Sequence, residues 1–380
     1  MNDQAIEHAL QSIFFDTDLH ARRVLSLSHA VLGAIQAAQA GVASIGRAEA
    51  LVREVNPKHA IKQVDRFLSN EGFEVAVALR DVVRFVLGLR WKVVVSLDWT
   101  DYQGGDHHRI ALNLVTAHGR ATPLAWKTVR AAEMKNRRNR HEDELLRLFK
   151  SLLPSTVTQV VVLGDRGFAD TKLYDMLKGE LGFDFVIRFR GCISVRDEDG
   201  VARPGRQWVP RNGYALSLPN AKVTGKHFEV AAVVAVKKAR MKESWLLATS
   251  LKIPADDVVA LYAKRFTIEE NFRDEKDWRF GLGSRWVKIA RTDRRDRLCL
   301  ILALAAILMT LLGKAGEEIG LDRFLRANTV KRRTHSLFRQ GREYLHGAVG
   351  KMRNAAERLW KRFVALVNIQ PRVAAEMAVI

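Results

Sequence analysis

The chain has 380 residues, and 62 Lys and Arg against 42 Asp and Glu give it a formal net charge of +20. Its 48% hydrophobic and 27% charged residues are typical of a globular protein and exclude a disordered chain. A positive excess of this size favours a partner with a phosphate backbone or an anionic surface, while a merely basic protein stays an alternative. The length predicts two or three packed units.

Several sequence features argue against secretion or membrane insertion. The start of the chain, MNDQAIEHALQSIFFDTDL, carries acids where a signal peptide has positive charge. The longest apolar stretch, residues 298–312, is shorter than the roughly 20 residues that span a bilayer, so we expect a buried helix there. Cys192 and Cys299 lie far apart, which argues against a disulfide framework. We expect a cytoplasmic protein with no membrane partner.

Residues 1–85 show helical apolar spacing, as in AIEHALQSIF and HARRVLSLSHAVLGAIQAA. Asn56 followed by Pro57 indicates a helix start, with Asn56 as the N-cap and Pro57 in the first turn. Basic residues then recur every four positions on one helix face, which is either a solvated face or a DNA contact. We predict a helical DNA-binding region over residues 1–85.

Strand patterns begin at Trp91. The β-branched run KVVVSL predicts a buried strand that delivers Asp98 at or near its end. Another short strand, VVVLG, leads to Asp165. Together with further strands near 109–117, 121–129 and 183–189 and helices near 141–152 and 170–179, these segments predict the first part of an α/β catalytic core over residues 86–190.

The rest of the chain divides into three parts. Residues 191–250 have Gly and Pro punctuation and short alternating runs, which predict a β-rich insertion. Residues 251–290 would complete the core with a helix over 254–277. Residues 291–380 would form a basic helical C-terminal region, with VKRRTHSLFRQGR as its densest positive run.

The helix predicted over 254–277 presents polar residues on one side. At about 100° per residue, four of them fall within an arc of about 60°, and these are Tyr262, Arg265, Glu269 and Lys276. Arg273 joins this face, whereas Glu270 points away from it, so Glu269 is the carboxylate chosen as catalytic.

Asp98, Asp165 and Glu269 are candidates for a shared metal site. Mg²⁺ prefers oxygen ligands, and two ions about 3.5–4 Å apart can activate an attacking oxygen and stabilise a leaving one. Taken singly, a strand-end Asp is usually a cap and a helix Glu is usually a solvated charge. Their occurrence together in this order favours the catalytic interpretation.

The segment YAKRFTIEENFRDEK matches the Tyr-x2-Arg-x3-Glu-x6-Lys signature of bacterial insertion-sequence DDE transposases. SLDWT and VVLGDRGF match the contexts of the first two acids of that family. More narrowly, the chain resembles the cut-and-paste branch, which has a β-strand insertion before the last acid. The resemblance covers roughly residues 55–290. It implies an RNase H-like mixed sheet with a β-rich insertion, flanked here by helical N- and C-terminal regions.

The resemblance also implies roles for individual residues. Asp98, Asp165 and Glu269 would be the catalytic residues and would bind two Mg²⁺ (or Mn²⁺) ions. Tyr262, Arg265, Lys276 and Arg188 would bind phosphates near the cleaved strand end, and Arg273 shares their helix face. Trp245 would stack on a flipped base, although ordinary core packing explains it equally well.

The function expected from this resemblance is DNA transposition. The protein would bind double-stranded DNA at terminal inverted repeats, cut it with a metal-activated water, and join the resulting 3′-hydroxyl to target DNA. The active complex would contain at least a homodimer, associated with the nucleoid when bound to DNA. Two alternatives stay open: another RNase H-like nuclease such as an integrase or resolvase, and a catalytically inactive transposase-derived DNA-binding repressor. The Tyr-Arg-Glu-Lys spacing argues against the first alternative, and metal-dependent cleavage of a DNA end distinguishes a transposase from the repressor.

Overall fold

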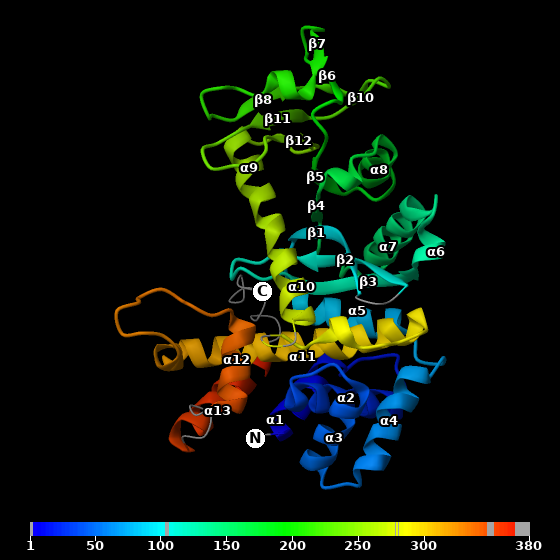
Figure 1. The fold of residues 1–380 in the computed structure, drawn as a ribbon, viewed down its shortest axis with the longest axis vertical. Coiled ribbons are helices and arrows are strands. Elements are labelled where there is room, and N and C mark those ends of the chain that lie inside the picture. Colours follow the sequence, from blue (N-terminus) through cyan, green and yellow to red (C-terminus); the bar gives the residue numbers. More distant parts are fainter. Residues whose placement is uncertain (1–2, 103–105, 278, 280, 348–352, 369–380) are drawn as a thin grey trace.

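A computed structural model describes residues 3–102, 106–277, 279, 281–347 and 353–368. A large mixed sheet occupies the middle of the molecule, with a helical region at one end and a β-rich region at the other (Figure 1). The chain is therefore a mixed α/β protein, and its central sheet is compatible with the RNase H-like fold that the sequence implies.

The N-terminal region is helical, as the sequence predicted. Asn56 caps the fourth helix because its side chain accepts a hydrogen bond from the Lys58 backbone N–H at 2.9 Å, and Pro57 opens the first turn. The helices are α1 (Asp3–Ile13), α2 (Ala21–Ala37), α3 (Val42–Arg53), α4 (Pro57–Ser69) and α5 (Val75–Leu87).

The central sheet has eight strands in the order β3-β2-β1-β4-β5-β12-β11-β8. β1 and β2 are antiparallel, as are β2 and β3, whereas β4 is parallel to both β1 and β5. The first five strands are β1 (Lys92–Asp101), β2 (His107–Leu114), β3 (Thr122–Arg130), β4 (Gln159–Gly164) and β5 (Asp184–Arg188). β1 continues three residues beyond Asp98, so this acid lies within the strand rather than at its end.

The strands after residue 190 belong to two sheets. Three of them extend the central sheet beyond β5, and these are β8 (Leu216–Pro219), β11 (Ala232–Val236) and β12 (Trp245–Thr249). The other four form a second sheet: β6 (Ser194–Arg196), β7 (Ala202–Pro204), β9 (Lys222–Val223) and β10 (Phe228–Glu229). The predicted β content is present, but part of the segment expected as an insertion is continuous with the central sheet.

Helices that come after β3 and β4 in the sequence lie beside the central sheet (Figure 1). α6 (Ala131–Met134) and α7 (Arg138–Leu152) follow β3, and α8 (Thr171–Asp175) continues as a π-helical turn over Met176–Glu180. α7 and α5 both contact β3. The predicted helix near 170–179 is therefore present, with an irregular second half.

The long helix α11 (Thr292–Glu318) joins the helical and sheet regions, because it contacts α2, α4, α5 and β3. Among the described helices, α11 alone is long and apolar enough to cross a membrane, but 89% of its most apolar window is buried inside the protein. The buried helix expected at 298–312 is thus confirmed. α12 (Leu337–His346) and α13 (Arg353–Asn368) follow it, and parts of the predicted C-terminal region, 348–352 and 369–380, lie outside the described residues.

The helix predicted over 254–277 is interrupted. α9 (Ala255–Ala263) is followed by a 3₁₀ turn over Lys264–Phe266 and then by α10 (Thr267–Lys276). Such a turn tightens the helix, so the face calculated for a continuous α-helix holds only within each half. Tyr262 lies in α9, Arg265 in the 3₁₀ turn, and Glu269 and Lys276 in α10.

Candidate active site

The first two acids meet because their strands are parallel neighbours. Leu97 of β1 and Gly164 of β4 are paired in register. Asp98 is the next residue within β1, and Asp165 directly follows the last residue of β4, so the two acids lie side by side. Asp165 also begins a 3₁₀ turn over Arg166–Phe168, and its Oδ1 accepts a hydrogen bond from the Gly167 N–H at 2.7 Å. Its carboxylate is fixed by the turn that ends the strand.

The third acid is linked to the first through a single guanidinium. Arg265 donates from Nη1 to Asp98 Oδ2 at 3.2 Å and from Nη2 to Glu269 Oε1 at 2.9 Å. The Arg265 side chain is only 7% exposed, whereas that of Glu269 is 52% exposed. Arg265 thus holds a strand acid and a helix acid together at the surface of the sheet.

Asp98 lies in an electrostatically unfavourable place for a carboxylate. Burial raises its pKa from 3.8 to about 6; Arg265 opposes this shift, and the charges of Asp165 and Glu269 add to it. The pKa of Asp98 therefore depends on the charges of both other acids. An additional positive charge at this place would favour its ionised form.

The three carboxylates supply the oxygen donors that Mg²⁺ and Mn²⁺ prefer. Within the described part of the chain, no three Asp, Glu, His or Cys side chains lie close enough together to form a ready metal site. Arg265 stands between Asp98 and Glu269. The donor set fits a hard divalent cation, and holding one would require the guanidinium to shift.

The other residues of the signature surround Arg265 or the adjoining strand. The Arg265 guanidinium lies 4.8 Å from the Phe266 ring and 5.9 Å from the ring of Tyr262, which is buried. The Arg265 Nε atom is also buried and has no hydrogen-bond partner among the described residues. Lys276 donates to Asp101 O at 2.5 Å and to Thr100 Oγ1 on β1.

Trp245 and Tyr262 pack edge to face, with ring centroids 5.0 Å apart. Trp245 is partly buried on β12 and also lies 6.0 Å from the Phe266 ring. It therefore takes part in core packing beside the site. Arg273 is separate from this cluster, since its exposed side chain pairs with Glu270 at 3.0 Å.

Sequence reasoning missed Glu243, which pairs with two arginines near the acids. Arg188 donates to Glu243 Oε2 at 2.7 Å and to Ser244 O at 3.1 Å. Arg166, directly after Asp165, reaches the same Glu243 oxygen at 3.4 Å. The hydrogen bond from Arg188 lowers the Glu243 pKa below its ordinary value. No local motif marks this residue, because the partners are 55 and 77 positions away.

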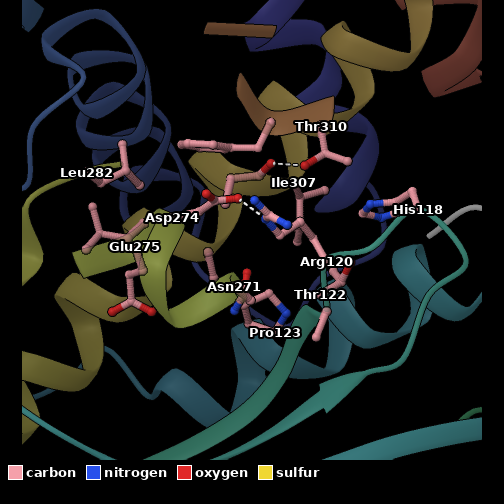
Figure 2. Close-up of a pocket in the computed structure, with 15 residues that line it drawn as sticks. His118, Arg120, Thr122, Pro123, Asn271, Asp274, Glu275, Leu282, Ile307 and Thr310 are labelled. Carbon is pink, nitrogen blue, oxygen red and sulfur yellow. Dashed lines mark hydrogen bonds and ion pairs between the residues drawn. The ribbon is translucent and has the colours of Figure 1, made fainter. Parts of the chain in front are cut away.

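The opposite face of α10 is fastened to the β2–β3 hairpin. Arg109 of β2 donates to Glu275 at 2.9 and 2.6 Å, and Arg120 of the hairpin turn donates to Asp274 at 2.7 Å. Figure 2 shows Arg120 and Asp274 pointing toward one another at a small cavity, which is lined in part by Asn271 and by residues of α11. At 100° per residue, these positions lie on the side of α10 away from Glu269.

His107 is buried in β2 at 3% exposure, and His108 pairs with Asp101 at 2.5 Å. Cys192 is exposed and Cys299 is buried, and the two form no disulfide.

Comparison with protein families identifies the central part of the chain. Residues 91–308, more than half of the 380, match the family described as Transposase DDE domain. The matched range contains β1, β4 and α10, and therefore all three candidate acids. No curated protein matches the chain.

Proposed function

The chain belongs to the family of transposase DDE domains, whose substrate is DNA, and from this premise we propose that it cuts the ends of its own element and joins them to target DNA. One observation carries the proposal. Asp98 and Asp165 emerge side by side from parallel strands, and Arg265 links Asp98 to Glu269 of α10. The three carboxylates therefore lie around the same region of the sheet, near the ends of β1 and β4.

In this proposal Asp98, Asp165 and Glu269 hold two divalent cations, Mg²⁺ or Mn²⁺. When bound, such ions stabilise charge on the attacking and leaving oxygens of an in-line displacement. Arg265 leaves the carboxylates and donates to an oxygen of the scissile phosphate, for which its unpartnered Nε is a further donor. The rings of Tyr262 and Phe266 lie against the guanidinium and stabilise its charge through cation–π contacts.

Other basic residues would orient the DNA around this centre. Arg188 and Lys276 would contact phosphates on either side of the acids, and Arg273 would extend the path along α10. Trp245, packed against Tyr262, would support the site and offer its accessible ring edge to a base. The narrower assignment to the cut-and-paste branch rests on the Tyr-Arg-Glu-Lys spacing.

Cutting two element ends together requires at least two active sites, so we propose a homodimer in the active complex. The helical region 1–85 and the basic tail over residues 320–365 are the candidates for end recognition and pairing. The mass of the complex with an end-bearing duplex tests this: one protomer per two cleaved ends would contradict it.

The catalytic proposal is tested by cleavage of duplexes that carry the sequences flanking the coding region. Wild type should nick them with Mg²⁺ or Mn²⁺ and not with EDTA, and Asp98→Asn should bind them without nicking. Asp175→Asn, at the exposed end of α8, is the carboxylate control and should cut normally. Equal cutting by wild type and Asp98→Asn would refute the proposed catalytic site. Tight binding without cutting by wild type would favour a repressor.

A further inference from the structure

A charged groove begins at Glu269 and runs along the open face of α10. Its lining includes Glu269, Arg273 and Lys276 from the helix, Asp277 directly after it, and Arg285 and Trp286 from the next turn. Its volume of about 420 Å³ lies within the about 300–1,000 Å³ typical of sites for small ligands. The groove is continuous with the candidate active site, because Glu269 belongs to both.

The turn that carries Arg285 and Trp286 is tied firmly to α10. The Leu282 N–H donates to Asp274 O at 2.9 Å, and the Gly283 N–H donates to Asp277 O at 3.0 Å. A Cβ on Gly281 would lie 2.0 Å from the Asp274 carbonyl oxygen, so this close approach requires glycine. Ser284 is 1% exposed and donates to Glu275 Oε1 at 3.3 Å. The turn therefore holds Arg285 and Trp286 at a fixed place beside the helix.

Trp286 is 57% exposed, although the turn that carries it is anchored. A large aromatic ring left in water forgoes the stabilisation that burial would give it. Its neighbours in the groove are three basic residues, Arg273, Lys276 and Arg285. An accessible ring beside cations is the combination that binds single-stranded nucleic acid, where bases stack and phosphates pair with the charges.

The cations of the groove are only partly neutralised. Arg285 forms no ion pair with any carboxylate in the described part of the chain, and Arg273 pairs only with the partly exposed Glu270. Burial is the largest cause of the lowered Lys276 pKa of about 8; the charge of Arg285 lowers it further, and the charges of Glu275 and Asp101 oppose the shift. Asp277 is the one groove carboxylate besides Glu269. A polyanion would relieve this repulsion.

We propose that the groove is a subsite for an unpaired nucleotide of the DNA strand next to the scissile phosphate, with its base stacked on Trp286 and its phosphates against Arg285 and Arg273. This subsite rests on the proposed function for its place in the reaction. It also makes a claim of its own, which is that the protein distinguishes an unpaired DNA end from a blunt one.

The subsite can be tested by binding without any cleavage. The probe is a duplex with a three-nucleotide single-stranded overhang that carries 2-aminopurine at its first unpaired position, in EDTA. Wild type should quench the 2-aminopurine fluorescence by stacking. Trp286→Ala should remove the quenching and weaken binding of this probe by roughly 5- to 100-fold, the range of a lost base–aromatic stack. Trp286→Phe should restore much of both.

The matched control is Trp91→Ala. Trp91 is also exposed, at 63%, but it precedes β1 and lies seven residues from Asp98, roughly 20 Å along the strand. Trp91→Ala should quench and bind as wild type does. Arg285→Ala should weaken binding by several-fold and reduce its dependence on salt. Both tryptophan variants should keep the wild-type Tm, because their side chains are exposed.

Two outcomes would overturn the subsite: quenching by Trp286→Ala equal to that of wild type, or an equal loss of affinity for overhang and blunt duplexes. The cleavage assay separates this result from the fate of the proposed function. Quenching that depends on Trp286 in a protein that never cleaves would leave the subsite standing and reject the catalytic role. Normal cleavage with quenching that does not depend on Trp286 would support the catalytic role and reject the subsite.

Discussion

Each of the two faces of α10 has an arginine that pairs with carboxylates, but the two pairings differ in burial and in charge balance. On the hairpin side, Arg109 is 4% exposed and holds Glu275 with two hydrogen bonds. On the open side, Arg265 divides its donors between Asp98 and Glu269. Burial would raise the Glu275 pKa, but Arg109 holds it below its ordinary value, whereas Asp98 stays raised.

This difference separates a structural ion pair from the one at the proposed active site. Glu275 has further partners in Ser284 and Tyr102, both at 3.3 Å, so its charge is fully accommodated. The charges of Asp165 and Glu269 raise the Asp98 pKa, and Arg265 offsets them only in part. One face thus fixes the position of α10 against β2, and the other leaves negative charge for a cation to neutralise. The predictions below test this division.

The largest effect should come from removing the Arg109–Glu275 ion pair on the hairpin side of α10. Arg109→Met leaves the Glu275 carboxylate buried without its partner, which should destabilise the protein by about 3–5 kcal/mol. Adding Glu275→Leu should recover part of this loss, because no unpaired charge is then buried. Urea unfolding measures both variants, and a single mutant within 1 kcal/mol of wild type would contradict a structural role.

The adjacent acids Glu269 and Glu270 give a matched pair on the open face. Glu269→Gln should lower the rate of DNA cleavage by about 100- to 1,000-fold, as expected for removal of a group that stabilises charge in the transition state. Glu270→Gln loses its pairings with Arg273 and Arg120, both outside the three candidate acids, and should cut at nearly the wild-type rate. The single-turnover rate with Mg²⁺ is the measurement. A reversed ranking would transfer the catalytic role to Glu270.

Asp98→Asn should make the metal-free protein more stable at neutral pH while it abolishes cleavage. A pKa of about 6 in the folded state against 3.8 unfolded means that ionisation of Asp98 opposes folding above pH 6. Removing it should therefore add about 3 kcal/mol at pH 7. The gain should shrink as pH falls from 6 toward 3.8, where both states become protonated. A stability difference that does not change with pH would contradict the shift.

The smallest effect concerns Glu243, which forms ion pairs with Arg188 and Arg166 in the absence of DNA. Glu243→Gln should free both guanidinium groups for phosphate and tighten DNA binding by roughly a few-fold at most, since a solvent-exposed ion pair is weak. Fluorescence anisotropy with a labelled duplex at low salt measures it. Glu198→Gln, on an exposed loop between β6 and β7, serves as the charge-matched control and should change affinity less.

Local sequence determined the elements and the catalytic candidates. The β-branched run before Asp98, the strand before Asp165 and the Asn56 cap follow from side-chain sterics and hydrogen bonding over a few residues. The Tyr-Arg-Glu-Lys spacing likewise lies within one short stretch of the chain, residues 262–276, although a 3₁₀ turn divides it between two helices. These features were predicted because neighbours along the chain are sufficient to specify them.

Tertiary structure alone decided how the elements are joined. The Arg109–Glu275 pair spans 166 positions, and the pairing of β5 with β12 brings Arg188 beside Leu247. Neither partner can be read from periodicity, since many carboxylates and strands were equally available. The 3₁₀ turn at Arg265 and the exposure of Trp286 depend on these same long-range contacts. Sequence specifies which groups can react, and packing between distant segments decides which of them meet, because only the folded chain fixes their distances.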